Sequence, residues 1–160
     1  MRTAIYPGSF DPITFGHVDL IKRSLAIADR VIVGVLGNSA KHPLFTASER
    51  AGQVRLAVRG LRRVEVESFD GLLVDFLRRK HGSMVIRGLR AVFDFEYEFQ
   101  LALTNRRLER TAETVFLMPA ERFTFLSSSV VKEIARLHGS VRGLVPPHVA
   151  SALRGKYSGR

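Results

Sequence analysis

A histidine near the start of the chain stands where it could act on a phosphate group. Residues 8–17 (GSFDPITFGH) follow an apolar run, are rich in turn formers, and place His17 in the first turn of a predicted helix. The amino terminus of a helix carries unpaired backbone N–H groups and about half a positive charge. An imidazole beside them can join them in holding phosphate oxygens. Taken alone, His17 also fits an ordinary surface histidine.

A run of serines offers a second place of the same kind. Ser127, Ser128 and Ser129 precede another predicted helix, and Lys132 follows one turn further on. One hydroxyl is enough to cap a helix. The additional hydroxyls and the unpaired amides of the helix start therefore indicate a cradle for a polyphosphate. Simple capping with spare polar residues is the alternative.

Charged side chains lie between these two segments. Arg87 and Arg90 flank a glycine at the end of a predicted strand, which suits bidentate binding of phosphate. Lys41, in a loop after another strand, could swing over the site, although a solvated loop lysine is also expected. Asp94 and Glu98 are one helical turn apart and either face a ribose hydroxyl or a hydrated cation, or complement the helix dipole.

The elements that must position these residues alternate regularly along the chain. Short runs rich in Val, Ile or Phe predict buried parallel strands, and segments of helical period fill the gaps between them. We therefore expect one Rossmann-like α/β domain over residues 1–160, with helices on both faces of a five-stranded parallel sheet and a basic tail from about residue 155. Ligands of such sheets bind outside the carboxyl ends of the strands, where the strand order reverses. The predicted strands are 3–6, 31–36, 64–68, 84–86 and 114–117, and the predicted helices are 16–28, one starting at 46, 72–80, 93–108, 127–139 and 147–153.

Composition narrows the class of protein. The formal net charge of +10 attracts anions such as nucleotides, nucleic acids or acidic lipids. With no cysteine there is no disulfide, no thiolate zinc site and no cysteine nucleophile, which favours a reducing, cytoplasmic setting. We expect no membrane partner, since no apolar run approaches the roughly 20 residues of a membrane helix. Nucleic-acid binding remains an alternative function, but the arginines are dispersed and no known binding module is present.

Several segments together resemble a known family. Residues 14–17 (TFGH) match the T/H-x-G-H signature of the nucleotidyltransferase superfamily, and residues 127–133 occupy the place of its second, serine-rich signature. With residues 6–12 (YPGSFDP), 86–90 (IRGLR) and 94–98 (DFEYE), the chain resembles the bacterial phosphopantetheine adenylyltransferases over nearly its whole length. The resemblance implies transfer of adenylate from ATP to 4'-phosphopantetheine, which gives dephospho-coenzyme A and pyrophosphate by direct in-line attack.

The same resemblance implies roles for individual residues. His17 would stabilise the transition state, with Lys41 and Arg90 as further catalytic residues. Mg²⁺ would be the cofactor, with no protein ligand named, and the enzyme would be a homohexamer inhibited by coenzyme A. The substrate side would include Ser9, Lys41, Leu73 and Arg87, and ATP would contact Ser9, Phe10, His17, Gly88, Leu89, Arg90, Glu98, Phe123, Thr124, Phe125, Leu126, Ser127, Ser128 and Ser129.

The two signatures leave the acceptor substrate open. Both signatures concern nucleotide phosphates and say little about the second substrate. An adenylyltransferase for nicotinate mononucleotide and a cytidylyltransferase for an alcohol phosphate therefore remain alternatives. In each case the nucleophile is a phosphate monoester, whose second pKa is about 6, so most of it is already doubly ionised at neutral pH. The reaction then needs no general base.

Overall fold

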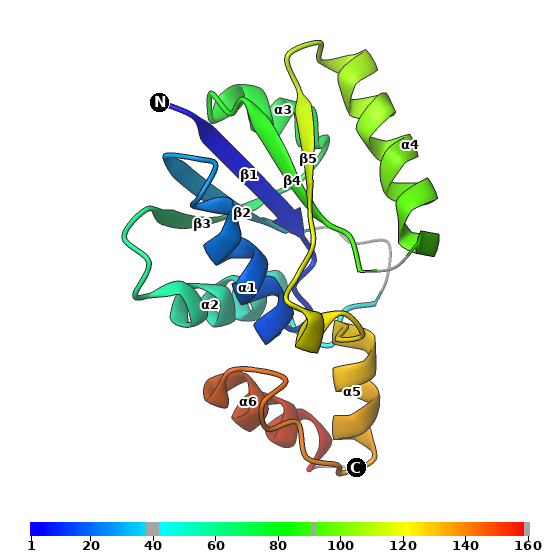
Figure 1. Ribbon diagram of the computed structural model, residues 1–160. Coiled ribbons are helices and arrows are strands. Elements are labelled where there is room, and N and C mark those ends of the chain that lie inside the picture. Colours follow the sequence, from blue (N-terminus) through cyan, green and yellow to red (C-terminus); the bar gives the residue numbers. More distant parts are fainter. Residues whose placement is uncertain (38–41, 91, 159–160) are drawn as a thin grey trace.

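Five parallel strands form the centre of the protein. The computed structural model describes residues 1–37, 42–90 and 92–158 (Figure 1). The strand order is β3-β2-β1-β4-β5, and all neighbouring pairs are parallel. Every predicted strand is confirmed to within two residues at each end. The strands are β1 (Thr3–Gly8), β2 (Arg30–Leu36), β3 (Val64–Phe69), β4 (Met84–Gly88) and β5 (Glu113–Leu117).

Helices cover both faces of this sheet. Alternate residues of a strand point to opposite faces, and the buried side chains divide accordingly into two clusters. Tyr6 packs in a cluster with Ile21 and Val54, whereas its neighbour Ile5 packs in another with Phe76. The predicted fold class is therefore confirmed. The helices are α1 (Phe15–Ser24), α2 (Ala47–Val58), α3 (Leu73–Arg79), α4 (Val92–Leu108), α5 (Ser128–Arg136) and α6 (Pro147–Tyr157), with a 3-10 turn, η1 (Glu121–Phe123), before α5.

The ends of three helices differ from the predictions, and one of them, α5, ends at Arg136 rather than at residue 139. Helix α1 ends at Ser24, four residues before the predicted end, because the Ser24 carbonyl accepts hydrogen bonds from the amides of Ile27 and Ala28 in a closing turn. Helix α6 continues to Tyr157, so residues 155–157 are helical and do not belong to the predicted basic tail. Lys156 holds this end of α6 through an ion pair with Glu49 of α2.

The strand order reverses between β1 and β4, and this sets the position of the site. The crossover from β1 through α1 leads to β2 on one side, whereas β4 returns to the other side of β1. A crevice forms at the carboxyl ends of strands where neighbouring crossovers diverge in this way. In Figure 1 these ends point toward η1 and the start of α5. Among the described helices, none is both long and apolar enough to cross a membrane.

We predict that Phe76→Ala strongly destabilises the protein. Phe76 is 1% exposed and stacks on Phe69 with ring centroids 4.5 Å apart. Truncation of such a buried ring leaves a cavity and lowers the free energy of unfolding by about 3–5 kcal/mol, measurable by urea denaturation. The control Leu56→Ala removes a side chain that is 54% exposed, and we expect a change within about 0.5 kcal/mol. Equal losses in the two variants would contradict this assignment of the core.

Candidate active site

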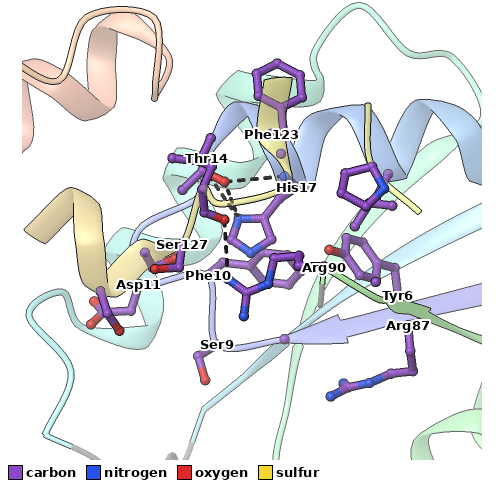
Figure 2. Close-up of a pocket in the computed structure, with 18 of the residues that line it drawn as sticks. Tyr6, Ser9, Phe10, Asp11, Thr14, His17, Arg87, Arg90, Phe123 and Ser127 are labelled. Atoms are coloured by element: carbon purple, nitrogen blue, oxygen red, sulfur yellow. Dashed lines mark hydrogen bonds between the residues drawn. The ribbon is translucent and has the colours of Figure 1, made fainter. Parts of the chain in front are cut away.

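A cavity of about 430 Å³ opens at the carboxyl ends of β1 and β4 (Figure 2). Its walls come from six segments far apart in the sequence. They are the end of β1 with the loop after it, the first half of α1, residues 42–43 before α2, the end of β4, Glu98 of α4, and the stretch from Pro119 into α5. The two segments singled out for phosphate binding, around His17 and around Ser127, therefore face one cavity.

His17 is held by reciprocal hydrogen bonds with the residue that caps α1. The Thr14 hydroxyl accepts from the His17 amide, and the Thr14 amide donates to His17 Nδ1 over 3.0 Å (Figure 2). In most such capping boxes the third helical residue is Glu or Gln; here it is the imidazole. Because Nδ1 accepts a hydrogen bond, the neutral ring carries its proton on Nε2. His17 therefore enters the cavity wall as an N–H donor.

Burial keeps this ring uncharged. Desolvation, reinforced by the positive charge of Arg90, lowers the pKa of His17 from 6.5 to about 4. The Phe10 ring packs edge-on against the imidazole at 5.2 Å, and Phe10 itself adopts a φ of 50°. At neutral pH the site therefore contains a positioned neutral donor, which suits the stabilisation of charge that builds on a phosphate oxygen.

Asp11 joins three parts of the site. Its buried carboxylate accepts from the amides of Leu44 and Phe45, each at 2.9 Å, and from Lys132 Nζ at 2.7 Å. The loop after β1 is thus tied both to the segment before α2 and to α5. Lys132 lines the cavity, as the sequence suggested, but with its charge already paired.

The three serines divide between structural and open positions. Ser127 caps α5, since its hydroxyl accepts from the Val130 amide, and Ser128 donates to the Pro12 carbonyl at 2.7 Å. Ser129 lines the cavity and is exposed. The first amides of α5 have no intrahelical partner. Capping and ligand binding, considered as alternatives for this segment, are therefore compatible.

Both arginines at the end of β4 pair with acids of α4. Arg87 makes a bidentate ion pair with Glu98 at 2.5 and 2.6 Å, and Arg90 lies 3.5 Å from Asp94. Gly88 between them gives room to the Leu20 side chain of α1, whose terminal methyl would have to shift if position 88 carried a Cβ. The carboxylates thus fix the two guanidinium groups at the cavity before any ligand arrives.

Most of the predicted site residues meet at this cavity. Four of the described ones do not line it: Leu89, Thr124, Leu73, which packs beside the cluster around Phe76, and Phe125, which is 89% exposed. Lys41 lies outside the described residues. The predicted residues that line the cavity are Ser9, Phe10, His17, Arg87, Gly88, Arg90, Glu98, Phe123, Leu126, Ser127, Ser128 and Ser129.

Three further residues that shape this site, His42, Asp11 and Arg50, were not predicted as site residues. His42 lines the cavity, although nothing in its sequence surroundings indicated a place there. Asp11 lies in residues 6–12, which carry the family resemblance, but no role was predicted for it. Arg50 is completely buried; its signal was its place on the same helical stripe as Val54 and Val58, where a charged residue is unusual.

Comparison of the amino-acid sequence with known proteins shows which family this chain belongs to. A family model described as cytidylyltransferase-like matches residues 5–134. Phosphopantetheine adenylyltransferase from Thermodesulfovibrio yellowstonii is 55% identical over 157 residues, which cover 98% of both chains. The protein of that name from Nostoc punctiforme is 56% identical over 92% of this chain and 80% of its own. This chain belongs to the phosphopantetheine adenylyltransferase family.

The fold is also found in a more distant structure. The crystal structure of the lipopolysaccharide core biosynthesis protein from Thermoplasma volcanium superposes on this chain with a TM-score of 0.57 at 21% sequence identity. The superposed region covers 76% of this chain and 99% of the Thermoplasma volcanium chain. At this identity the likeness concerns the fold alone. The phosphopantetheine adenylyltransferase assignment therefore depends on the sequence relatives and on the site.

The described residues do not form a metal cage. They contain no group of three or more His, Asp or Glu side chains that could hold an ion. The acids at or beside the cavity are already bound to Lys132, Arg87 and Arg90. Mg²⁺ commonly binds through substrate phosphates and water with only one or two carboxylates.

We predict that His17 stays neutral, with its proton on Nε2, from pH 5.5 to 8. Its pKa of about 4 means that protonation begins only below this range. Proton–nitrogen correlation NMR of ¹⁵N-histidine-labelled protein reports the tautomer, and the His17→Asn variant identifies the resonance. A midpoint between pH 6 and 7, or a proton on Nδ1, would contradict the assignment.

Proposed function

We propose that this protein catalyses the transfer of adenylate from ATP to 4'-phosphopantetheine, with release of pyrophosphate and formation of dephospho-coenzyme A. One observation carries the proposal: a neutral imidazole N–H donor and the amino termini of two helices line the same cavity. Relatives at 50–56% identity over nearly the whole chain carry the name of this activity. The family agrees with a nucleotidyltransferase reaction.

The chemistry requires positioning more than proton transfer. A phosphate oxygen of phosphopantetheine attacks the α-phosphorus of ATP, and the bond from this phosphorus to the bridging oxygen breaks as pyrophosphate leaves. The nucleophile is already ionised, so no base is needed. His17 donates from Nε2 to an α-phosphate oxygen as charge builds there, a role that preorganised donors perform well. The amides at the start of α5 and Arg90 bind the departing phosphates.

The acceptor phosphate faces the other side of the cavity in this proposal. Ser9, exposed at the end of β1, and Arg87 are the described candidates there. The resemblance also implied Lys41, which lies outside the described residues, and Leu73, which does not line the cavity. Since Arg87 is already paired with Glu98, the phosphate shares this guanidinium rather than meeting a free one. The remaining lining residues of α1, η1 and α5 would then surround ATP.

We further propose that Mg²⁺ acts on the nucleotide, where it neutralises phosphate charge. Removal of Mg²⁺ with EDTA is expected to abolish pyrophosphate release. Calorimetric titration of the nucleotide-free protein with MgCl₂ is expected to show no binding in the micromolar range, because the acids of the cavity are paired. Tight binding without nucleotide would contradict a substrate-borne metal.

We also propose that coenzyme A inhibits the protein and that the protein forms a homohexamer. Coenzyme A contains the product's entire framework, so it is expected to compete at this cavity and act as a feedback inhibitor. Exposed Phe95, Phe99 and Leu103 on α4 favour self-association, consistent with the expected homohexamer, and sedimentation velocity measures it. The lack of cysteine fits the expected cytoplasmic location.

We predict that the acceptor is 4'-phosphopantetheine rather than another phosphate ester. Incubation with ATP, Mg²⁺ and 4'-phosphopantetheine should yield dephospho-coenzyme A, detected by mass spectrometry. Nicotinate mononucleotide with ATP, and glycerol 3-phosphate with CTP, serve as the competing pairs. Turnover of either pair in preference to phosphopantetheine would replace the proposed substrate.

We predict that His17→Ala lowers kcat by about 10²-fold or more, the usual cost of losing one preorganised donor. Circular dichroism and urea denaturation verify that the variant is folded. His81→Asn is the control, since His81 is exposed in the turn before β4, at the opposite end of the sheet, and asparagine tolerates its φ of 50°. Unchanged turnover in His17→Ala would remove His17 from the mechanism.

A further inference from the structure

We propose that Arg50 is a positioning residue of this active site, which holds the carboxyl ends of β1 and β2 and the start of α2 in one fixed arrangement and thereby sets the position of His17. The inference rests on the proposed function for the identity of the reaction. The contacts that carry it are independent of that identity.

The side chain of Arg50 is fully buried and is bound by backbone oxygens. Its Nη1 donates to the Ser9 carbonyl at 2.6 Å and to the Leu36 carbonyl at 2.8 Å. Nη2 donates to the Gly37 carbonyl at 3.3 Å, and Nε to the Phe45 carbonyl at 3.1 Å. One guanidinium thus joins the loop after β1 to both ends of the connection from β2 to α2.

A side chain in this position acts on the site only through the backbone. Arg50 does not line the cavity, and within the described residues it forms no ion pair with a carboxylate. Burial of a guanidinium is costly unless its N–H groups are satisfied. A buried carboxylate could have satisfied the N–H groups of Arg50 equally well. Because all four acceptors are backbone carbonyls of two separate connections, this guanidinium holds those connections together.

The contact with the Ser9 carbonyl leads directly to His17. Ser9 and Phe10 share a peptide group, and Phe10 has the unusual φ of 50°, which places its ring against the imidazole at 5.2 Å. Left-handed backbone is costly for an aromatic residue, so other contacts must maintain it. The bond from Arg50 fixes the carbonyl side of this peptide. Loosening it is expected to move Phe10 and then His17.

The segment before α2 is held from both sides. Asp11 accepts from the Phe45 amide, and Arg50 donates to the Phe45 carbonyl. Asp11 of the loop after β1 therefore binds the amide of Phe45, and Arg50 of α2 binds the carbonyl of the same residue. Lysine cannot replace this arrangement, because its three donors radiate from one atom, whereas arginine spreads five across a planar fork.

The test compares Arg50→Lys with a matched arginine. Arg63 also donates to two backbone carbonyls, of Leu25 and Ala28, each at 3.2 Å, but at the amino edge of the sheet and away from the cavity. We expect Arg50→Lys to lower kcat by about 10- to 10²-fold, the scale of a 1 Å misplacement, with a much smaller change in the KM for ATP. Arg63→Lys should leave kcat unchanged at a temperature where both variants are folded.

A second readout does not depend on the reaction. In Arg50→Lys the NMR signals of His17 and the Phe10 ring should shift, whereas Arg63→Lys should leave them in place. If the wild-type protein formed no dephospho-coenzyme A, the proposed function would be wrong, but this spectroscopic test would still apply. Unshifted His17 signals, equal kcat losses in the two variants, or failure of Arg50→Lys alone to fold would overturn the positioning role.

Discussion

The reciprocal hydrogen bonds between Thr14 and His17 are the interaction on which the rest of the site depends. They cap α1, so the fold requires them, and they occupy Nδ1, so the chemistry of the ring is decided by the same contact. A buried imidazole with Nδ1 engaged is neutral and presents only an N–H to the cavity. It can donate to a phosphate oxygen, but it is neither a base nor a nucleophile. Structure and mechanism are therefore fixed together.

Charge at the cavity is organised before any ligand is present. Each lining arginine and lysine of the described chain has an acidic partner, and the pairs are Arg87 with Glu98, Arg90 with Asp94, and Lys132 with Asp11. These pairs hold the cations in position and moderate their attraction for phosphate. ATP and a second phosphate together bring roughly six negative charges. Helix amides and His17, which are not paired with acids, then supply donors that need no reorganisation.

The sequence predicted those features that depend on residues close together in the chain. Buried parallel strands are apolar on both faces, so all five were predictable, and the helix expected to start at 46 begins at Ala47 with Thr46 as its cap. It was silent where contacts are distant: the partners of Asp11 lie up to 121 residues away. The capping role of His17 was missed because the motif normally uses Glu or Gln. Arg50 was missed because helical periodicity describes a buried stripe and not the loops that face it.

The central claim is that His17 acts as a donor in a single direct displacement. The measurement that tests it most directly is the stereochemical course at the α-phosphorus, determined by ³¹P NMR of the product formed from one diastereomer of adenosine 5'-(1-thiotriphosphate). A single in-line attack inverts the configuration, and this is the result we predict. A covalent adenylyl-enzyme would split the reaction into two displacements. Retention of configuration would show this and would contradict the account.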